Sequence, residues 1–304
     1  MAEKVVGYPG VSNGKEVFLT GHAFRKNRLK NLRPGQSRLT NLRHMIRRFR
    51  LRPMKQVKVE VYLNGQKHHV KTNELGYFTC QVPQPYAESG WYDYELCFEG
   101  KKGSNRAKGE YYVASDHETA VISDIDDTLL VSHSTRLLKK INLLAFRNAH
   151  TRKPIPLIKH WYNHISDLND DEMPQDFFYV SNSEWNLYDF LKDFFQLNNI
   201  PKGVFFLRTL KKGLRDLARS GSTGSNHKED TISWLFEFFP KKNFILVGDN
   251  GQKDLDIYHE FCTKYADRVK GVMIRKLSHV KKDHKMEMVE NELKDLGIPL
   301  KFFH

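Results

Sequence analysis

Cysteine is scarce in this 304-residue chain, and the few cysteines are scattered. Cys80, Cys97 and Cys262 are odd in number and show neither the pattern of a disulfide framework nor that of a zinc site. No stretch reaches the roughly 18 uninterrupted apolar residues of a membrane-spanning helix. The first ten residues lack the apolar core of a secretory signal. These absences argue against disulfide-stapled and integral membrane proteins, and we expect a cytoplasmic protein.

Acidic residues are absent from the segment Arg25–Lys55, which holds twelve lysines and arginines and nearly all of the net charge of +13. Residues 37–50 have a helical pattern in which five apolar side chains share one arc, with most arginines outside it. A basic amphipathic helix can lie on an anionic membrane surface. It can equally pack its apolar stripe on the rest of the protein. No nucleic-acid-binding motif accompanies the charge, so we expect no nucleic acid partner.

The first 115 residues have the pattern of short strands. Residues 56–63 alternate between apolar and polar side chains, and Asn64-Gly65 follows them as a strong signal for a tight hairpin turn. Similar β-prone runs occupy residues 15–24, 67–71, 77–82, 91–98 and 110–113. Short strands separated by turn residues predict a small antiparallel β-sandwich over residues 1–115.

The remaining residues, 116–304, alternate apolar strands with helical stretches. The predicted strands are 119–124, 177–181, 203–207, 243–248 and 271–275, and helices are predicted over 185–196 and 229–239. This alternation is typical of an α/β domain with a parallel sheet. We therefore predict two domains, with boundaries at 1–115 and 116–304.

Polar residues follow several of the predicted strands. Asp124 and Asp126 follow the first strand, Ser181 ends the second, and Asp249 ends the fourth. Ligands of open parallel sheets bind at the carboxyl ends of the strands, so we expect these side chains to meet. Lys228 precedes the fourth strand and can join them. Carboxylates, a hydroxyl and a lysine are the groups that phosphoryl transfer with a divalent cation requires.

The motifs resemble those of a known superfamily. Asp124-Ile-Asp-Asp-Thr128, followed by Ser181, Lys228 and Asp249…Asp254, looks like the four motifs of the haloacid dehalogenases. The flanking residues narrow the match. The segments 179–183, 227–228 and 248–258 are similar to the phosphatidate phosphatase family typified by the actin patch protein. The resemblance implies a Rossmannoid phosphatase domain that converts phosphatidate to diacylglycerol and phosphate.

The resemblance also implies roles for individual residues. Asp124 would be the nucleophile that forms an aspartyl-phosphate, Asp126 the general acid and base, and Lys228 the cation that neutralises the transferring group. Thr128, Ser181 and Asn182 would bind the substrate, with Ser181 on the phosphoryl oxygens and Thr128 fixing the loop.

The implied cofactor is Mg²⁺, with four aspartates as its expected ligands: Asp124, Asp126, Asp249 and Asp254. The expected partner is a phosphorylated lipid, with an anionic membrane surface as a possible second partner through Arg25–Lys55. Two alternatives stay open. The phosphatase can act on a soluble phosphate ester or a phosphoprotein, or the chain can be a catalytically idle module that binds anionic membranes or nucleic acid.

Overall fold

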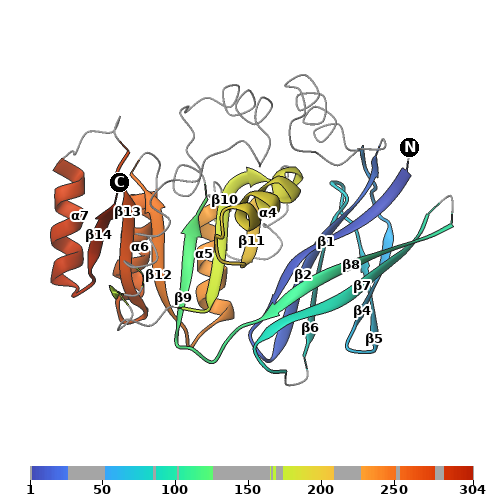
Figure 1. Ribbon diagram of the computed structural model, residues 1–304, viewed down its shortest axis with the longest axis horizontal. Coiled ribbons are helices and arrows are strands. Elements are labelled where there is room, and N and C mark those ends of the chain that lie inside the picture. Colours follow the sequence, from blue (N-terminus) through green and yellow to red (C-terminus); the bar gives the residue numbers. More distant parts are fainter. Residues whose placement is uncertain are drawn as a thin grey trace.

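The computed structural model contains two β-sheets placed side by side along the long axis of the molecule (Figure 1). It describes residues 2–26, 52–84, 87–100, 103–125, 165, 167–168, 174–208, 227–250, 254–277 and 284–303. Within these residues, no helix combines the length and the apolarity needed to cross a bilayer.

The N-terminal sheet, sheet A, has eight strands in the order β3-β2-β1-β8-β7-β4-β5, with β6 paired to β2. The strands are β1 (Ala2–Ser12), β2 (Glu16–Lys26), β3 (Arg52–Pro53), β4 (Lys58–Leu63), β5 (Gln66–Lys71), β6 (Tyr77–Pro83), β7 (Gly90–Gly100) and β8 (Gly103–Val113). All pairs are antiparallel except β1 with β8. The predicted β region is confirmed, but hydrogen bonds join its strands into one curled, mainly antiparallel sheet.

The hairpin between β4 and β5 shows how the sequence pattern forms sheet A. Val59, Val61 and Leu63 are buried, and the residues between them are more exposed, as the alternating pattern predicts. Asn64 and Gly65 have φ angles of 50° and 75°, which a type I′ turn requires. The predicted turn therefore sets the β4–β5 register.

The second sheet, sheet B, is wholly parallel and has the order β11-β10-β9-β12-β13-β14. Its strands are β9 (Thr119–Asp124), β10 (Asp176–Glu184), β11 (Val204–Arg208), β12 (Asn243–Asp249), β13 (Val269–Arg275) and β14 (Leu300–Phe303). The helices are η2 (Trp185–Leu187), α4 (Tyr188–Leu197), α5 (His227–Phe238), α6 (Asp254–Lys264), η3 (Ala266–Arg268) and α7 (His284–Asp295). All five predicted strands and both predicted helices are present, whereas α6, α7 and β14 were not predicted.

Helices cover both faces of sheet B. On β9, Ala120 and Ile122 pack into a core that includes α5, α6 and α7, while Val121 faces the core that includes α4. A strand buried on both faces must be apolar at every position, which is why residues 119–124 read as a continuous run instead of an alternating one.

A buried ion pair at the amino ends of the sheet B strands is hydrogen-bonded to sheet A. Lys242 Nζ lies 2.6 Å from Asp176 Oδ2. The Tyr112 hydroxyl and the Ser115 backbone N–H both donate to Asp176 Oδ1 at 2.9 Å. Asp176 begins β10, and Tyr112 belongs to β8, so this contact ties sheet A to sheet B.

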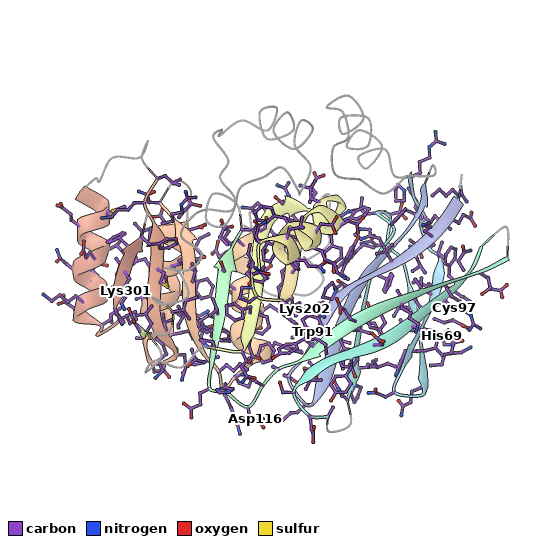
Figure 2. All side chains as sticks on the ribbon, in the orientation of Figure 1. His69, Trp91, Cys97, Asp116, Lys202 and Lys301 are labelled. Carbon is purple, nitrogen blue, oxygen red and sulfur yellow. The ribbon has the colours of Figure 1, made fainter. Side chains whose placement is uncertain are left out.

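A second contact between the sheets lies nearer the surface (Figure 2). The ammonium of Lys202, just before β11, lies 3.7 Å from the ring centroid of Trp91 on β7 and 2.6 Å from Glu110 Oε2 on β8. The predicted boundary at residue 115 falls between β8 and β9. Most of the basic segment, including the predicted helix over 37–50, lies outside the described residues.

Candidate functional site

Polar residues near the carboxyl ends of three strands of sheet B lie in one row, to within one residue. Asp124 ends β9 and pairs with Val180 of β10, while Val247 of β12 pairs with Ser123. Ser181 and Asp249 therefore each lie one residue further along the strands that flank Asp124. All three side chains are at most 1 % exposed. The sheet register thus brings together residues that are more than fifty positions apart in the sequence, as predicted.

Lys228 contacts this row at Asp124. It belongs to the first turn of α5, and its Nζ lies 2.9 Å from Asp124 Oδ1 and also bonds Asp254 Oδ1. Burial disfavours the charge of Lys228, but Asp124 and Asp254 outweigh burial and raise its pKa above the ordinary value. A lysine near a helix N-terminus also opposes the helix dipole, so these carboxylates are needed to hold it there.

Asp254 approaches the row because the facing residue is a glycine. A Cβ on Gly248 would lie 2.7 Å from Asp254 Oδ2, closer than real contacts allow. The backbone N–H of Asp249 donates to the same Oδ2 at 3.4 Å. Gly248 therefore has a steric role that sets the position of the carboxylate of Asp254.

The three carboxylates can share a cation. One oxygen from each of Asp124, Asp249 and Asp254 lies within 4.8 Å of the others, and all three residues are buried. Mg²⁺ takes oxygen ligands and commonly one or two carboxylates with water and substrate phosphate. The donor set and its burial fit such an ion.

The other predicted site residues divide into two groups. Ser181 is fully buried, and its Oγ accepts a hydrogen bond from the Ser183 backbone N–H at 2.9 Å, whereas Asn182 is exposed. Successive strand residues point to opposite faces, which explains the difference. Asp126 and Thr128 lie outside the described residues, and their roles stay predictions.

Trp185 of η2 and Tyr188 of α4 pack against sheet A. The Trp185 ring stacks on His22 with centroids 4.0 Å apart, and the Tyr188 ring meets Tyr8 edge-on at 5.4 Å. Sequence reasoning missed Tyr8 and His22 because β1 was not predicted and nothing in the sequence indicates which face of β2 meets sheet B.

Known proteins resemble this chain over the region that contains the site. Residues 119–276 match the family described as "Phosphatidate phosphatase APP1, catalytic domain". The chain is 31% identical over 169 residues to phosphatidate phosphatase APP1 of Saccharomyces cerevisiae, covering 56% of this chain and 28% of that protein. It is 26% identical over 217 residues to the uncharacterized protein C29B5.04c of Schizosaccharomyces pombe, covering 68% of this chain and 34% of that protein.

The chain thus spans about a third or less of the length of these two relatives. Among solved structures, a carbohydrate acetylesterase from Xanthomonas citri aligns with 92% of this chain and 70% of its own, at 9% identity and a TM-score of 0.27, which is too low to assign a fold. The family match includes the strands from β9 to β13, the helices between them and all the described candidate residues of the site. Because that match covers more than half of the chain, the chain belongs to the family of phosphatidate phosphatase APP1 catalytic domains.

Proposed function

We propose that this chain is a Mg²⁺-dependent phosphatase that hydrolyses phosphatidate to diacylglycerol and phosphate through an aspartyl-phosphate on Asp124. Family membership supports the substrate class. The observation that carries the chemistry is the buried contact of Lys228 with Asp124, with Asp249 and Asp254 within reach of one cation. We assign the catalytic domain, over residues 116–304, to the Rossmannoid haloacid dehalogenase fold, and residues 1–115 to a separate β-domain.

In the first step, a carboxylate oxygen of Asp124 attacks phosphorus as the bond from phosphorus to the lipid oxygen breaks. Asp126 gives a proton to that oxygen, and diacylglycerol leaves. Lys228 stays protonated at neutral pH because its pKa is raised, so it acts as a fixed positive charge beside the phosphoryl oxygens and not as a base. Ser181 donates its hydroxyl hydrogen to one of these oxygens.

In the second step, Asp126 takes a proton from water while that water attacks the phosphorus of the aspartyl-phosphate. Inorganic phosphate leaves, and Asp124 is restored. Asp124 and Asp249 would hold Mg²⁺, with Asp254 supporting them from beside Lys228, and Asp126 would add a backbone carbonyl. When bound, the ion would offset the repulsion between these carboxylates and the phosphate oxygens.

We also propose that the enzyme works at an anionic membrane surface as a cytoplasmic, peripheral protein. The support is the charge of Arg25–Lys55, which nearly equals the net charge of the chain. Each lysine or arginine near an anionic surface contributes about 1 kcal/mol of attraction. Sedimentation with phosphatidylserine vesicles tests this, since changing the arginines of 43–50 to Gln should release the protein.

A substrate panel tests the proposed chemistry. Phosphate release is measured from phosphatidate in mixed micelles, from glycerol 3-phosphate and from a phosphopeptide, each with Mg²⁺ and with EDTA. We expect turnover of phosphatidate that requires Mg²⁺ and exceeds turnover of the other two. Preference for glycerol 3-phosphate or the phosphopeptide would favour the soluble substrates. No release from any substrate would favour the catalytically idle module.

A further inference from the structure

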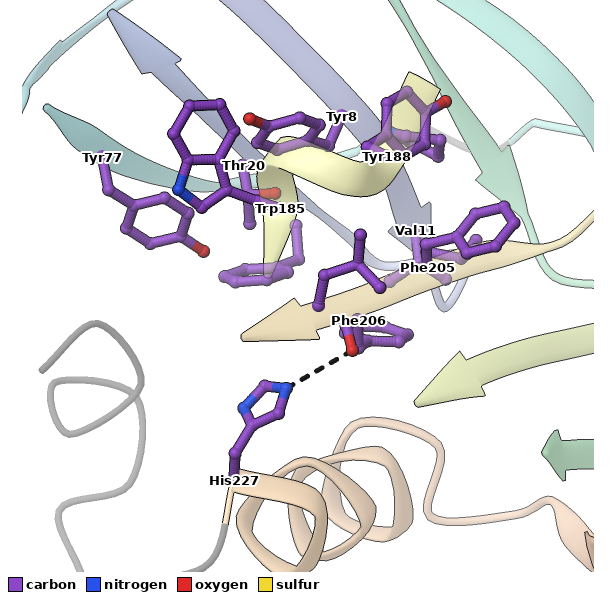
Figure 3. A pocket seen from close by; sticks show the side chains of 13 residues that line it. Tyr8, Val11, Thr20, Tyr77, Trp185, Tyr188, Phe205, Phe206 and His227 are labelled. Carbon is purple, nitrogen blue, oxygen red and sulfur yellow. Dashed lines mark hydrogen bonds between the residues drawn. The ribbon is translucent and has the colours of Figure 1, made fainter. Parts of the chain in front are cut away.

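A pocket lies between sheet A and the edge strand of sheet B (Figure 3). Tyr8 of β1 and Phe18 of β2 line one side, and Trp185 of η2 and Phe205 of β11 line the other. Its cavity volume is about 40 Å³, which leaves room for a short group only, and part of the pocket is open to solvent. β11 is the last strand of sheet B, so sheet A covers an edge that would otherwise be bare and leaves this space along it.

The lining of the pocket is almost entirely apolar. Among the described residues, no lysine, arginine, aspartate or glutamate lines it. His227 is at one end, where its Nε2 lies 3.4 Å from the backbone oxygen of Phe206. Burial lowers the pKa of His227 to about 4, so the ring is neutral at pH 7. Such a pocket suits an uncharged apolar group and not a second phosphate or a sugar.

The pocket lies in the same row of the sheet as the candidate nucleophile. Asp124 of β9 pairs with Val180 of β10, and Val180 pairs with Phe206 of β11. Neighbouring strands are about 4.8 Å apart, so Phe206 lies about 10 Å from Asp124 across the sheet. Ser181 pairs directly with Leu207, which also lines the pocket. In a phosphorylated diacylglycerol, the ester groups follow the phosphate within a few bonds.

One polar group in the pocket wall has no hydrogen-bond partner among the residues that the structure describes. The Tyr8 side chain is only 7% exposed, and its hydroxyl is buried without a hydrogen-bond partner among the described residues. Leaving a buried donor unpaired costs about 1–3 kcal/mol. An ester carbonyl entering the pocket would supply an acceptor in otherwise apolar surroundings.

We propose that this interface pocket holds the first part of one acyl chain of a phosphorylated lipid whose phosphate lies at Asp124. Sheet A then forms half of the lipid site, with the Tyr8 hydroxyl donating to the ester of the bound chain. This inference rests on the proposed phosphatase function, because it needs the phosphate at Asp124 to set the distance to the chain.

Kinetics with two matched substrates test the pocket. Dioctanoyl phosphatidate and glycerol 3-phosphate share the phosphate and the glycerol and differ in the acyl chains. Leu207→Trp places a large ring at the pocket. Leu197→Trp is the matched control, because Leu197 is the last residue of α4 and is 46% exposed. We expect Leu207→Trp to lower kcat/KM for the lipid at least tenfold more than for glycerol 3-phosphate, and Leu197→Trp to change neither. An equal loss on both substrates, or no loss, would overturn the proposal.

A binding measurement needs no turnover. It tests whether an acyl chain occupies the pocket even if Leu207→Trp does not fold or no ester is hydrolysed. The fluorescence of the Asp124→Asn variant is recorded with micelles containing phosphatidate brominated on one acyl chain. We expect quenching, and we expect most of it to disappear when Trp185→Phe is added. Quenching that is equally strong without the Trp185 indole would place the chain elsewhere and reject the pocket, even if the enzyme proved to be a phosphatidate phosphatase.

Discussion

Two sets of buried polar groups lie on either side of β10 and β11, and they differ in whether the groups are paired. At the carboxyl ends of the strands, the charges of Asp124, Lys228 and Asp254 contact one another. At the interface with sheet A, the Tyr8 hydroxyl and both ring nitrogens of His22 are buried without hydrogen-bond partners among the described residues. Burial lowers the pKa of His22 to about 3 and raises that of Tyr8 well above its ordinary value, so both stay neutral.

This difference suits the charged groups to phosphate chemistry and the apolar interface to lipid binding. Charges survive burial only when they are paired, so the paired set can act on a phosphate. Neutral, apolar surroundings cannot stabilise a phosphate but can accept hydrocarbon. A lipid phosphate ester has one end suited to each region, and the two regions lie about two strand spacings apart.

Removing the central ammonium should cost most. Lys228→Met leaves two buried carboxylates without their cation, which should destabilise the fold by about 3–5 kcal/mol and lower phosphatase turnover by about 10³-fold. Urea unfolding and phosphate release measure the two effects. Lys301→Met, which removes only the partly exposed pair with Asp167, should cost no more than about 1 kcal/mol and leave turnover unchanged. Similar losses in both variants would show that the Lys228 pair has no special importance.

Gly248→Ala tests whether Asp254 must lie close to Asp124 and Lys228. The new Cβ would meet the carboxylate of Asp254 and push it from the row, so we expect turnover to fall about 10- to 100-fold and the Mg²⁺ concentration for half-maximal rate to rise. Gly203→Ala is the matched control, because its Cβ would clash with the backbone oxygen of Phe177 away from the site. The control should lose stability and keep its Mg²⁺ dependence. An unchanged Mg²⁺ dependence in Gly248→Ala would show that Asp254 does not contribute to Mg²⁺ binding.

The free energy of unfolding should depend on pH through His22 at the interface between the sheets. The folded pKa of His22 is about 3 and lies below the unfolded value near 6.5, so the unfolded chain binds a proton that the folded chain does not. Stability from this group is therefore complete above pH 6.5 and falls as pH drops toward 3, by up to about 1.4 kcal/mol per pH unit. In denaturant unfolding between pH 7 and 4, His22→Phe should flatten this slope, while His69→Phe, an exposed change on β5, should retain it. Equal slopes for the two variants would show that His22 does not cause the pH dependence of stability.

The smallest effect should follow from Tyr8→Phe. The change keeps the ring and deletes a buried hydroxyl that has no hydrogen-bond partner in the described part of the chain, so thermal stability should be unchanged or slightly higher. If the hydroxyl donates to a lipid ester, KM for dioctanoyl phosphatidate should rise about three- to tenfold, and KM for glycerol 3-phosphate should not rise. A lower stability with unchanged lipid kinetics would mean that the hydroxyl serves the fold alone.

Sequence patterns predicted the regular parts of sheet B and the site, because strands buried on both faces are continuous apolar runs and their ends carry the polar residues. Asp124, Ser181, Lys228 and Asp249 meet where the α/β pattern predicted. The interface was beyond prediction, since it depends on which faces of β1 and β2 meet β11 across more than 150 residues of sequence. The parallel β1–β8 pairing was not predicted either, because pairing between the first and last strands of sheet A has no local signal in the sequence.

Phosphate release by Asp124→Asn tests the central claim most directly. The variant keeps the shape of the side chain and removes the nucleophilic carboxylate, and Asp93→Asn makes the same chemical change on the exposed face of β7. With phosphatidate and saturating Mg²⁺, we expect Asp93→Asn to match the unmodified chain and Asp124→Asn to lose at least about 10³-fold in turnover while it remains folded at the assay temperature. Turnover of a folded Asp124→Asn protein at the level of Asp93→Asn would contradict an aspartyl-phosphate on Asp124.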